Sequence, residues 1–306
     1  ISVFKKKDIP LIIGVMVASL IPALIFGFYQ LATGTGNQGT AGFNRINSTF
    51  VHPNAFAMYL EIMIIICVPL ITELKKMWHK IAIAGLCIAM LISLIFTYAR
   101  MSWFTLIVGL MILGVARYRW LLAAIPVSVI SVLILVPSIL ERMQEAAGFS
   151  QGQGSMYFRV MMWKYLLPRF YENPIIGNGL GSFVDFVEKG MGYFYLPHND
   201  YVRLLVDTGI IGLVCYIGAM LFMMRGAART YSVADENWTK MLSLIVVALL
   251  VVFLLGSFTE NLFRLGFLQN YIWSLGAMVA VAAREIVAKK SAVEESGMLL
   301  PRLQQA

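Results

Sequence analysis

The stretch MLSLIVVALLVVFLLGSF, residues Met241–Phe258, contains no charged side chain. A helix needs about 20 mostly apolar residues to cross the roughly 30 Å of hydrocarbon in a bilayer. Inside that layer no water is present to bond backbone N–H and C=O groups, so a crossing segment must pair them internally as a helix. The stretch therefore predicts a transmembrane helix, and with it a membrane protein.

Apolar stretches of comparable length recur along the whole chain. We interpret eight of them as spans, near Ile9–Leu31, Ala55–Leu74, Ile81–Tyr98, Ser102–Ala116, Trp120–Ile139, Val206–Met224, Met241–Phe258 and Gly266–Ala283. The sequence therefore predicts an all-α fold, a polytopic bundle of about eight transmembrane helices. We expect residues 1–306 to form a single integral membrane domain, because the spans leave no room for a second sizeable unit.

The composition agrees with a surface that mostly faces lipid. Hydrophobic residues make up 59% of the chain and charged residues only 13%, whereas a soluble domain averages roughly 25% charged residues. The net charge of +8 does not indicate nucleic acid binding, because most Lys and Arg lie in short runs between apolar stretches. The three cysteines lie inside apolar stretches, so we expect neither a disulfide framework nor a metal site.

The distribution of Lys and Arg predicts the orientation, because connections rich in these residues stay in the cytoplasm. The basic connections alternate along the chain and contain Lys5–Lys7, Lys75–Lys80, Arg117–Arg119, Arg225–Lys240 and Arg284–Lys290. Eight spans then place both termini in the cytoplasm. Residues 140–205, the longest stretch without a span, are predicted to form a large loop on the outward face.

Three arginines interrupt the otherwise Lys-poor outward connections: Arg45, Arg100 and Arg264. A planar guanidinium that is always charged is well suited to binding phosphate. Each of them alone is equally typical of an arginine that reaches lipid headgroups at the interface. The three together, with the arginines of the long loop, favour an outward site for an anionic ligand.

The long loop has three recognisable parts. Residues 148–154 form a polar Gly/Gln tract, which we expect to be flexible. Met156–Phe170 mixes aromatic and apolar residues with basic ones, a pattern typical of a helix that lies in the membrane interface. Arg159 and Trp163 are four residues apart and should share one face of that helix.

The third part contains glycines at 177, 179 and 181. Their spacing is wrong for a dinucleotide-binding loop. We interpret them as turn residues that allow close backbone approach; a phosphate-binding nest of backbone amides is the less favoured alternative.

The loop ends in PHNDY, residues 197–201, which contains His198. A neutral imidazole can accept a proton near pH 7, so His198 is a candidate general base. From spacing alone, a capping or structural role for this histidine is the more common outcome.

Polar groups near the outward ends of the spans supply further candidates. Asn54 and Glu61 are seven residues apart and should project from the same face of the second span. An ionisable group such as Glu61 inside a span usually faces a cavity or a partner. Glu260 and Arg264 are four residues apart, and we expect them to form a structural ion pair.

Several stretches in order resemble the O-antigen ligase and polymerase superfamily of bacterial envelope glycosyltransferases. They are FVHPN (50–54), TYAR (97–100), Arg159 before Trp163, NPIIGNGLGSF (173–183) and HNDY (198–201) followed by Leu, Asp and Gly positions. Each stretch is weak alone, but their order and their placement around a long outward loop agree with the family. The resemblance covers residues 43 to 215.

The resemblance implies an inverting glycosyltransferase that needs neither a metal nor another cofactor. Such enzymes move a glycan from an undecaprenyl-pyrophosphate carrier to an acceptor hydroxyl, on lipid A-core or on a growing glycan. By position, His198 resembles the family's general base, and Arg100 and Arg159 resemble the arginines that bind the pyrophosphate. We expect the remaining polar candidates to contact substrate: Arg45, Asn54, Glu61, Asn199, Tyr201 and Arg264.

The resemblance also implies a location in the bacterial cytoplasmic (inner) membrane, among membrane lipids, with the active site on the periplasmic or outer side. Family members have more spans than the eight predicted here, and the first residue is Ile1, so we expect N-terminal helices to be missing.

Three alternatives stay open at this point. The least favoured is a purely structural membrane scaffold, which would give no reason for arginines in the short outward connections. Within the family, the motifs do not separate a ligase from a polymerase of O-antigen or exopolysaccharide, or from a protein O-glycosylating enzyme. A transporter or flippase for polyprenyl-linked glycan is the rival from another class. Glu61 favours it, whereas the clustering of polar candidates at the outward ends does not.

Overall fold

The computed structural model describes residues 5–38, 44–136, 139, 155–191 and 196–303, and these residues are mostly helical. The elements in chain order are η1 (Lys6–Asp8), α1 (Ile9–Ala18), α2 (Leu20–Thr33), β1 (Asn37–Gln38), β2 (Asn44–Arg45), α3 (Pro53–Glu73), α4 (Met77–Phe96), α5 (Arg100–Ala116), α6 (Leu121–Leu135), α8 (Ser155–Glu172), α9 (Ser182–Met191), α10 (Asp200–Val233), α11 (Asn237–Gly256), η3 (Leu262–Arg264) and α12 (Gly266–Leu303). The two short strands pair antiparallel, with Asn37 opposite Arg45. The predicted polar tract 148–154 lies outside the described residues.

The prediction of an all-α polytopic membrane bundle is confirmed. Six described helical segments are long and apolar enough to cross a membrane: Lys6–Thr33, Pro53–Glu73, Met77–Phe96, Asp200–Val233, Asn237–Gly256 and Gly266–Ser291. The fourth and fifth predicted spans form the apolar helices α5 and α6, which are shorter. With 17 and 15 residues at about 1.5 Å per residue, they fall short of the roughly 30 Å hydrocarbon thickness.

Helices α3 and α11 form the centre of the bundle. The most apolar window of α3 is 89% buried and that of α11 is 72% buried, against 22% for α4. Helix α5 packs against both central helices, and Gly109 allows the close approach. A Cβ on Gly109 would lie 2.8 Å from Ile65 of α3 and 2.9 Å from Val252 of α11. The outer helices therefore leave much of their apolar surface exposed, where it can contact lipid.

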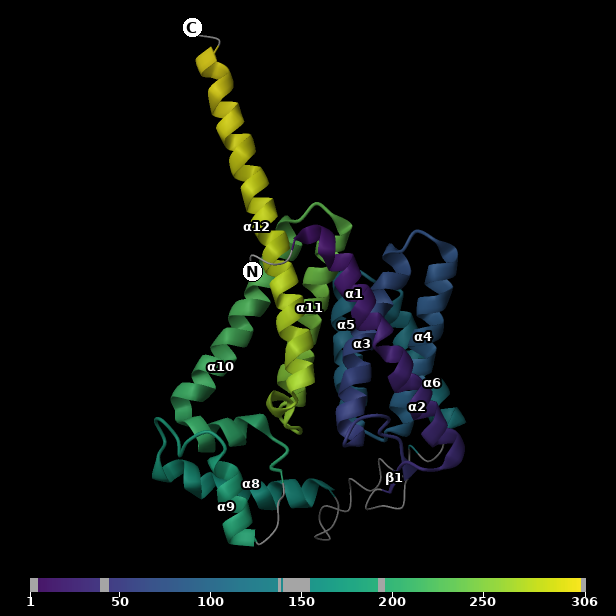
Figure 1. Cartoon of the computed structure of the whole chain (residues 1–306), viewed down its shortest axis with the longest axis vertical. Coiled ribbons are helices and arrows are strands. Elements are labelled where there is room, and N and C mark those ends of the chain that lie inside the picture. The colour runs from purple at the N-terminus through teal and green to yellow at the C-terminus, as the bar shows by residue number, and fades with distance from the viewer. Residues whose placement is uncertain (1–4, 39–43, 137–138, 140–154, 192–195, 304–306) are drawn as a thin grey trace.

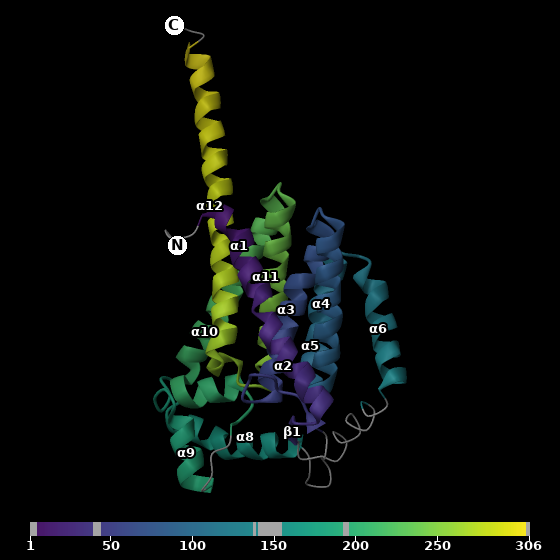
Figure 2. The same cartoon turned by 45° about the vertical axis from the view of Figure 1, so that its right-hand side comes forward.

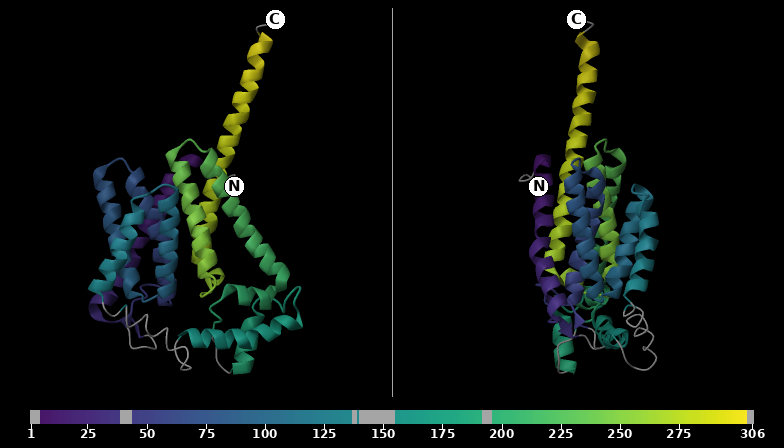
Figure 3. Two further views of the ribbon diagram at one scale, coloured as in Figure 1. Left: turned by 180° about the vertical axis from the view of Figure 1, so that it is seen from behind. Right: turned by 90° about the vertical axis from the view of Figure 1, so that its right-hand side faces the viewer.

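Different elements lie at the two ends of the bundle (Figure 1). The N-terminal helix α1 begins at the same end of the bundle from which the long α12 projects beyond the other helices (Figure 2). At the opposite end, α8 runs across the bundle and α9 lies beyond it (Figure 3). This placement of α8 fits the prediction of a helix in the membrane interface. We call this second end the loop end.

Candidate functional site at the loop end

A buried carboxylate connects three separate parts of the chain at the loop end. Glu260, between α11 and η3, is only 7% exposed. Its Oε1 accepts hydrogen bonds from Arg159 Nη2 at 2.9 Å and from Asn54 Nδ2 at 2.6 Å. Its Oε2 lies 3.0 Å from Nδ1 of His198. These partners belong to α8, the start of α3 and the segment before α10.

Arg45 joins this group through Asn54. Its Nη2 donates to Oδ1 of Asn54 at 2.5 Å, and its Nε donates to the carbonyl oxygen of Thr97 at 2.7 Å. The guanidinium thereby ties β2 to the start of α3 and to the end of α4. We call Arg45, Asn54, Arg159, His198 and Glu260 the Glu260 cluster.

Arg100 is electrostatically part of the same site. It is the first residue of α5, and its charge repels those of Arg159 and Arg45. Among the described residues, three guanidiniums and a single carboxylate, that of Glu260, therefore lie in this part of the structure, so positive charges outnumber negative ones. An excess of fixed positive charge in a mostly buried place favours an anionic ligand.

The electrostatic balance keeps the charges in place at neutral pH. Burial by itself would raise the pKa of Glu260, but the charge of Arg159 and the hydrogen bond of His198 outweigh it and lower this pKa to about 2. Burial, offset in part by Glu260, lowers the pKa of Arg45 to about 10. At pH 7 the carboxylate is therefore ionised and Arg45 is protonated.

The ionised carboxylate fixes the tautomer of His198. A carboxylate without a proton only accepts hydrogen bonds, so Nδ1 of His198 must carry the hydrogen that faces Glu260. The other ring nitrogen, Nε2, is then the one that carries no hydrogen in the neutral ring. His198 also has a left-handed backbone, with φ of 47°, in the sharp turn that leads into α10.

Helix α8 presents one face to this site, as the sequence predicts. Arg159 bonds to Glu260, and Trp163, one turn later, donates from Nε1 to the carbonyl oxygen of Pro197 at 2.6 Å. The indole thus holds the residue that precedes His198. The prediction that Arg159 and Trp163 share a face is confirmed.

Two candidates next to His198 have partners within the protein. Oδ1 of Asn199 caps α10 by accepting from the backbone N–H groups of Tyr201 and Val202. The hydroxyl of Tyr201 donates to the carbonyl oxygen of Leu254 at 2.6 Å. Both interactions position the start of α10; substrate contact by Asn199 or Tyr201 stays a prediction.

Asp200 fixes the connection that carries Glu260. Its fully buried side chain accepts from the hydroxyl of Ser257 at 3.1 Å and from the backbone N–H of Phe263 at 2.9 Å. The segment 257–263 is therefore held on the first turn of α10. This arrangement sets Glu260 against His198, two residues before Asp200.

The remaining two candidates lie apart from the Glu260 cluster. Glu61 is buried in α3 at 2% exposure, beside Thr105 of α5. Arg264 is exposed in η3 at the loop end. The pairing of Glu260 with Arg264 stays a prediction, and its premise of a continuous helix is not met, because the chain leaves the helix at Gly256 and Asn261 is not helical. Residues four apart meet only on a continuous helix.

The glycine-rich segment 173–183 packs against the kinked part of α10. Asp207 accepts from the backbone N–H of Gly181 at 3.1 Å, from that of Phe183 at 3.0 Å and from the hydroxyl of Ser182 at 3.0 Å. The carboxylate of Asp207 thus already occupies the amides that a phosphate would need. The nest alternative is wrong. The glycines at 177, 179 and 181 all have positive φ, as the interpretation as turn residues requires, but only Gly177 lies in close backbone contact, since a Cβ there would be 2.5 Å from Asp207.

Gly209 makes this packing possible and supplies a stability prediction. Its φ of 63° and ψ of −167° fall in a region that is essentially restricted to glycine. A Cβ there would lie 2.3 Å from the carbonyl oxygen of Ile175. Gly209→Ala should destabilise the protein by about 1–3 kcal/mol, measured by thermal unfolding in detergent. Gly218→Ala in the same helix, with open space around it, should not destabilise it; equal effects of both changes would contradict the assignment.

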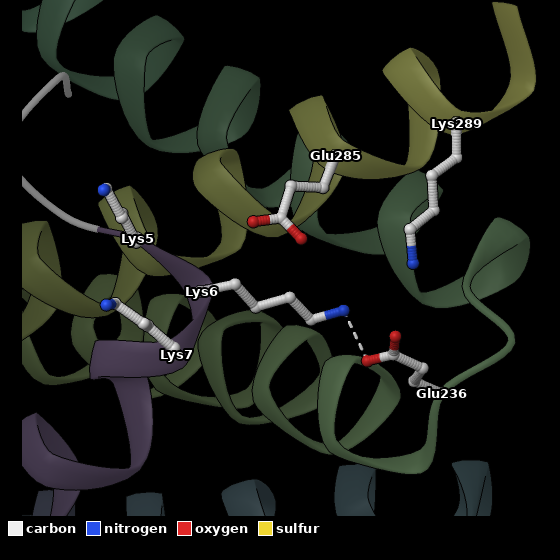
Figure 4. Close-up of a pocket in the computed structure, with 6 residues that line it drawn as sticks. All are labelled: Lys5, Lys6, Lys7, Glu236, Glu285 and Lys289. Atoms are coloured by element: carbon white, nitrogen blue, oxygen red, sulfur yellow. Dashed lines mark ion pairs between the residues drawn. The ribbon is translucent and has the colours of Figure 1, made fainter. Parts of the chain in front are cut away.

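A hollow of about 540 Å³ lies at the end opposite the Glu260 cluster (Figure 4). Its lining residues come from η1 and its flank, the start of α11 and α12: Lys5, Lys6, Lys7, Glu236, Glu285 and Lys289. Lys6 forms an ion pair with Glu236 across it. Positive charges also outnumber negative ones here, with four lysines and two glutamates, but most of these side chains are exposed and screened by water. The mostly buried Glu260 cluster is therefore the stronger candidate for an anion site.

Part of the chain is similar to a known protein family. Residues 85–217 match the family model described as O-antigen ligase. Over this segment, which is less than half of the chain, the protein is similar to the O-antigen ligase family. The matched segment includes Arg100, Arg159 and His198 but not Glu260.

A curated relative agrees with this assignment. The chain is 21% identical over 177 residues to a protein of Rickettsia conorii named "Putative polysaccharide ligase". The alignment covers 53% of this chain and 42% of that relative. The chain therefore spans less than half the length of the curated relative that it matches.

The sequence missed one member of the site, Glu260. Its partners Arg159, His198 and Asn54 are 101, 62 and 206 residues away in the chain, so no local pattern joins them. The available signal was an acidic residue in a short outward connection next to an apolar span. The structure brings Arg159, His198, Arg45 and Asn54 together, with Arg100 close enough to interact electrostatically.

Proposed function

We propose that this chain belongs to the O-antigen ligase superfamily and is a membrane glycosyltransferase that moves a glycan from undecaprenyl pyrophosphate to an acceptor hydroxyl. The acceptor is lipid A-core in a ligase or a growing glycan in a polymerase. The observation that carries the proposal is the contact of Glu260 with both Arg159 and His198, which joins a group of guanidiniums to a candidate base.

The guanidiniums suit the donor. When the sugar leaves, negative charge grows on the diphosphate oxygen to which it was bound. Arg45, Arg100 and Arg159 supply fixed positive charge in a mostly buried place, where such charge stabilises a transition state strongly. We infer that these charges replace the metal that many diphosphate enzymes use.

His198 suits the acceptor. Its Nε2 accepts the proton of the acceptor hydroxyl while the hydroxyl oxygen forms a bond to the anomeric carbon. The bond from that carbon to the diphosphate breaks, and its electron pair leaves with undecaprenyl pyrophosphate. Attack from the face opposite the leaving group inverts the anomeric configuration. A positioned base contributes about 10²–10⁴-fold to such a step.

We place the Glu260 cluster on the periplasmic or outer side of the bacterial inner membrane, with both termini in the cytoplasm. The basic residues support this orientation, because Lys5–Lys7, Lys240 and Lys289 lie at the end opposite the cluster. A donor anchored by its polyprenyl chain would bring its diphosphate to the interface, beside α8.

Transfer in vitro tests the proposal. Purified protein in detergent, supplied with a polyprenyl-diphosphate-linked glycan and an acceptor, should release polyprenyl pyrophosphate and form a glycosidic bond. A flippase, the function favoured by the buried Glu61 of α3, has no leaflets to act on in detergent and would make no product. Mass spectrometry of envelope glycans from a deletion strain then separates the branches: shorter chains indicate a polymerase, and unattached chains indicate a ligase.

A further inference from the structure

Glu260 uses its two oxygen atoms on two different sides of the site. Its Oε1 accepts from Nη2 of Arg159, which would bind the donor diphosphate, and from Nδ2 of Asn54. Its Oε2 contacts Nδ1 of His198, the candidate base. Arg159 belongs to α8, whereas Glu260 is held through Ser257 and Phe263 on α10. One carboxylate thus contacts both the group that would bind the donor and the group that would activate the acceptor.

A carboxylate oxygen and a diphosphate oxygen are equivalent partners for an arginine. Both are anionic acceptors that a guanidinium binds through the same N–H groups. In the structure, a carboxylate occupies Nη2 of Arg159 at 2.9 Å, with both side chains mostly buried at 14% and 10% exposure. A diphosphate that approaches Arg159 must therefore compete with Glu260 and overcome the repulsion of its charge.

We propose that Glu260 is a resident anion which the donor diphosphate displaces from Arg159, so that less of its charge is neutralised by Arg159 and more of it acts on His198. This inference rests on the proposed function and adds the order in which donor binding and acceptor deprotonation occur. Donor binding comes first and strengthens the base, so the acceptor is deprotonated only when a sugar is ready to receive it. Glu260 is a positioning residue, because it acts through Arg159 and His198.

The exchange depends on the charged and titratable groups that face Glu260 from each surrounding element. They are Arg45 of β2, His52 at the start of α3, Arg159 of α8 and His198 before α10. Arg100 of α5 acts on two of these groups, Arg45 and Arg159. All except the histidines carry fixed positive charge at neutral pH. The diphosphate can therefore take the place of Glu260 without leaving the site short of cations.

Glu260→Gln is the decisive variant, because it removes the charge and keeps the shape. The probe is farnesyl diphosphate, with farnesol as the control for the apolar chain. Without its competitor, Arg159 should bind farnesyl diphosphate about tenfold more tightly than in the wild type, the change that about 1.4 kcal/mol produces. Transfer at saturating donor should fall about 10²-fold or more, because His198 loses its orienting charge.

A matched control lies at the other end of α3. Glu73 accepts from Nη2 of Arg117 at 2.8 Å, with similarly low exposures of 11% and 21%. Glu73→Gln removes the carboxylate of an equivalent ion pair outside the site. It should leave both farnesyl diphosphate affinity and transfer unchanged.

Tighter binding together with slower transfer is the expected signature. A purely structural role for Glu260 would weaken both, so weaker or unchanged binding of farnesyl diphosphate to Glu260→Gln overturns the exchange. The proposed function survives that result if the wild type still transfers glycan. If Arg159→Ala binds farnesyl diphosphate as well as the wild type does, Arg159 does not bind the donor diphosphate. That result contradicts both the proposed donor site and the exchange.

A measurement on the wild type avoids any folding defect of the variant. The chain has three histidines, so ¹⁵N-histidine labelling gives few signals, and His79→Gln and His52→Asn assign them. Farnesyl diphosphate should move the Nδ1–H proton signal of His198 downfield, because Glu260 becomes a stronger acceptor when Arg159 leaves it. An unchanged His198 signal at saturating farnesyl diphosphate overturns the proposal.

Discussion

Replacing His198 with asparagine should slow glycan transfer about 10²–10⁴-fold, the usual contribution of a positioned general base. Asparagine is the better replacement than alanine, because it tolerates the left-handed backbone that His198 adopts, with φ of 47°. Initial rates of transfer by purified protein measure the effect at saturating donor. Protein level and membrane insertion should match the wild type.

The control for this prediction is His79→Gln. His79 lies at the start of α4, where its ring is 3.7 Å from that of Trp78, at the end opposite the Glu260 cluster. This change should leave transfer unaffected. A His198→Asn variant that transfers glycan at the wild-type rate would remove His198 from the role of base.

Replacing Arg159 with alanine should abolish transfer and also destabilise the protein. The ion pair with Glu260 is mostly buried, and removing one partner of such a pair costs about 3–5 kcal/mol, since it leaves an uncompensated charge. We expect the lower end of that range, because Asn54 and His198 still bond to Glu260. Thermal unfolding and transfer rates on the same preparation measure the two effects.

The double variant Arg159→Ala/Glu260→Gln separates these effects. Removing both charges should restore part of the stability, because no unpaired carboxylate stays buried. Transfer should stay absent, since the donor has lost its guanidinium. Recovery of transfer together with stability would mean that Arg159 serves only to neutralise Glu260.

The membrane fold followed from the sequence because the bilayer imposes a local rule. A stretch such as Met241–Phe258 must form a helix wherever it lies in the protein, and α11 covers most of it. Helical periodicity likewise predicted the shared face of Arg159 and Trp163. The same rule overestimated the fifth span, because Trp120–Ile139 was predicted and α6 covers Leu121–Leu135. Composition alone does not fix where a helix ends.

The site was only partly predictable, because its contacts join distant segments. Local spacing suggested that Glu260 would pair with Arg264, yet the chain leaves its helix at Gly256 and turns the carboxylate toward Arg159 and His198. The glycines 177, 179 and 181 were compatible with a nest or with close-packing turns. The carboxylate of Asp207 decided between the two.

The sequence by itself determined that this is a helical membrane protein with arginines and a histidine near one end of the bundle. Hydrophobic length and charge distribution are properties of single segments, so they can be read without coordinates. Only the tertiary structure decided that one buried carboxylate joins the arginine group to the histidine. Its hydrogen bonds depend on how α3, α8, α10 and α11 pack, and no single segment carries that information.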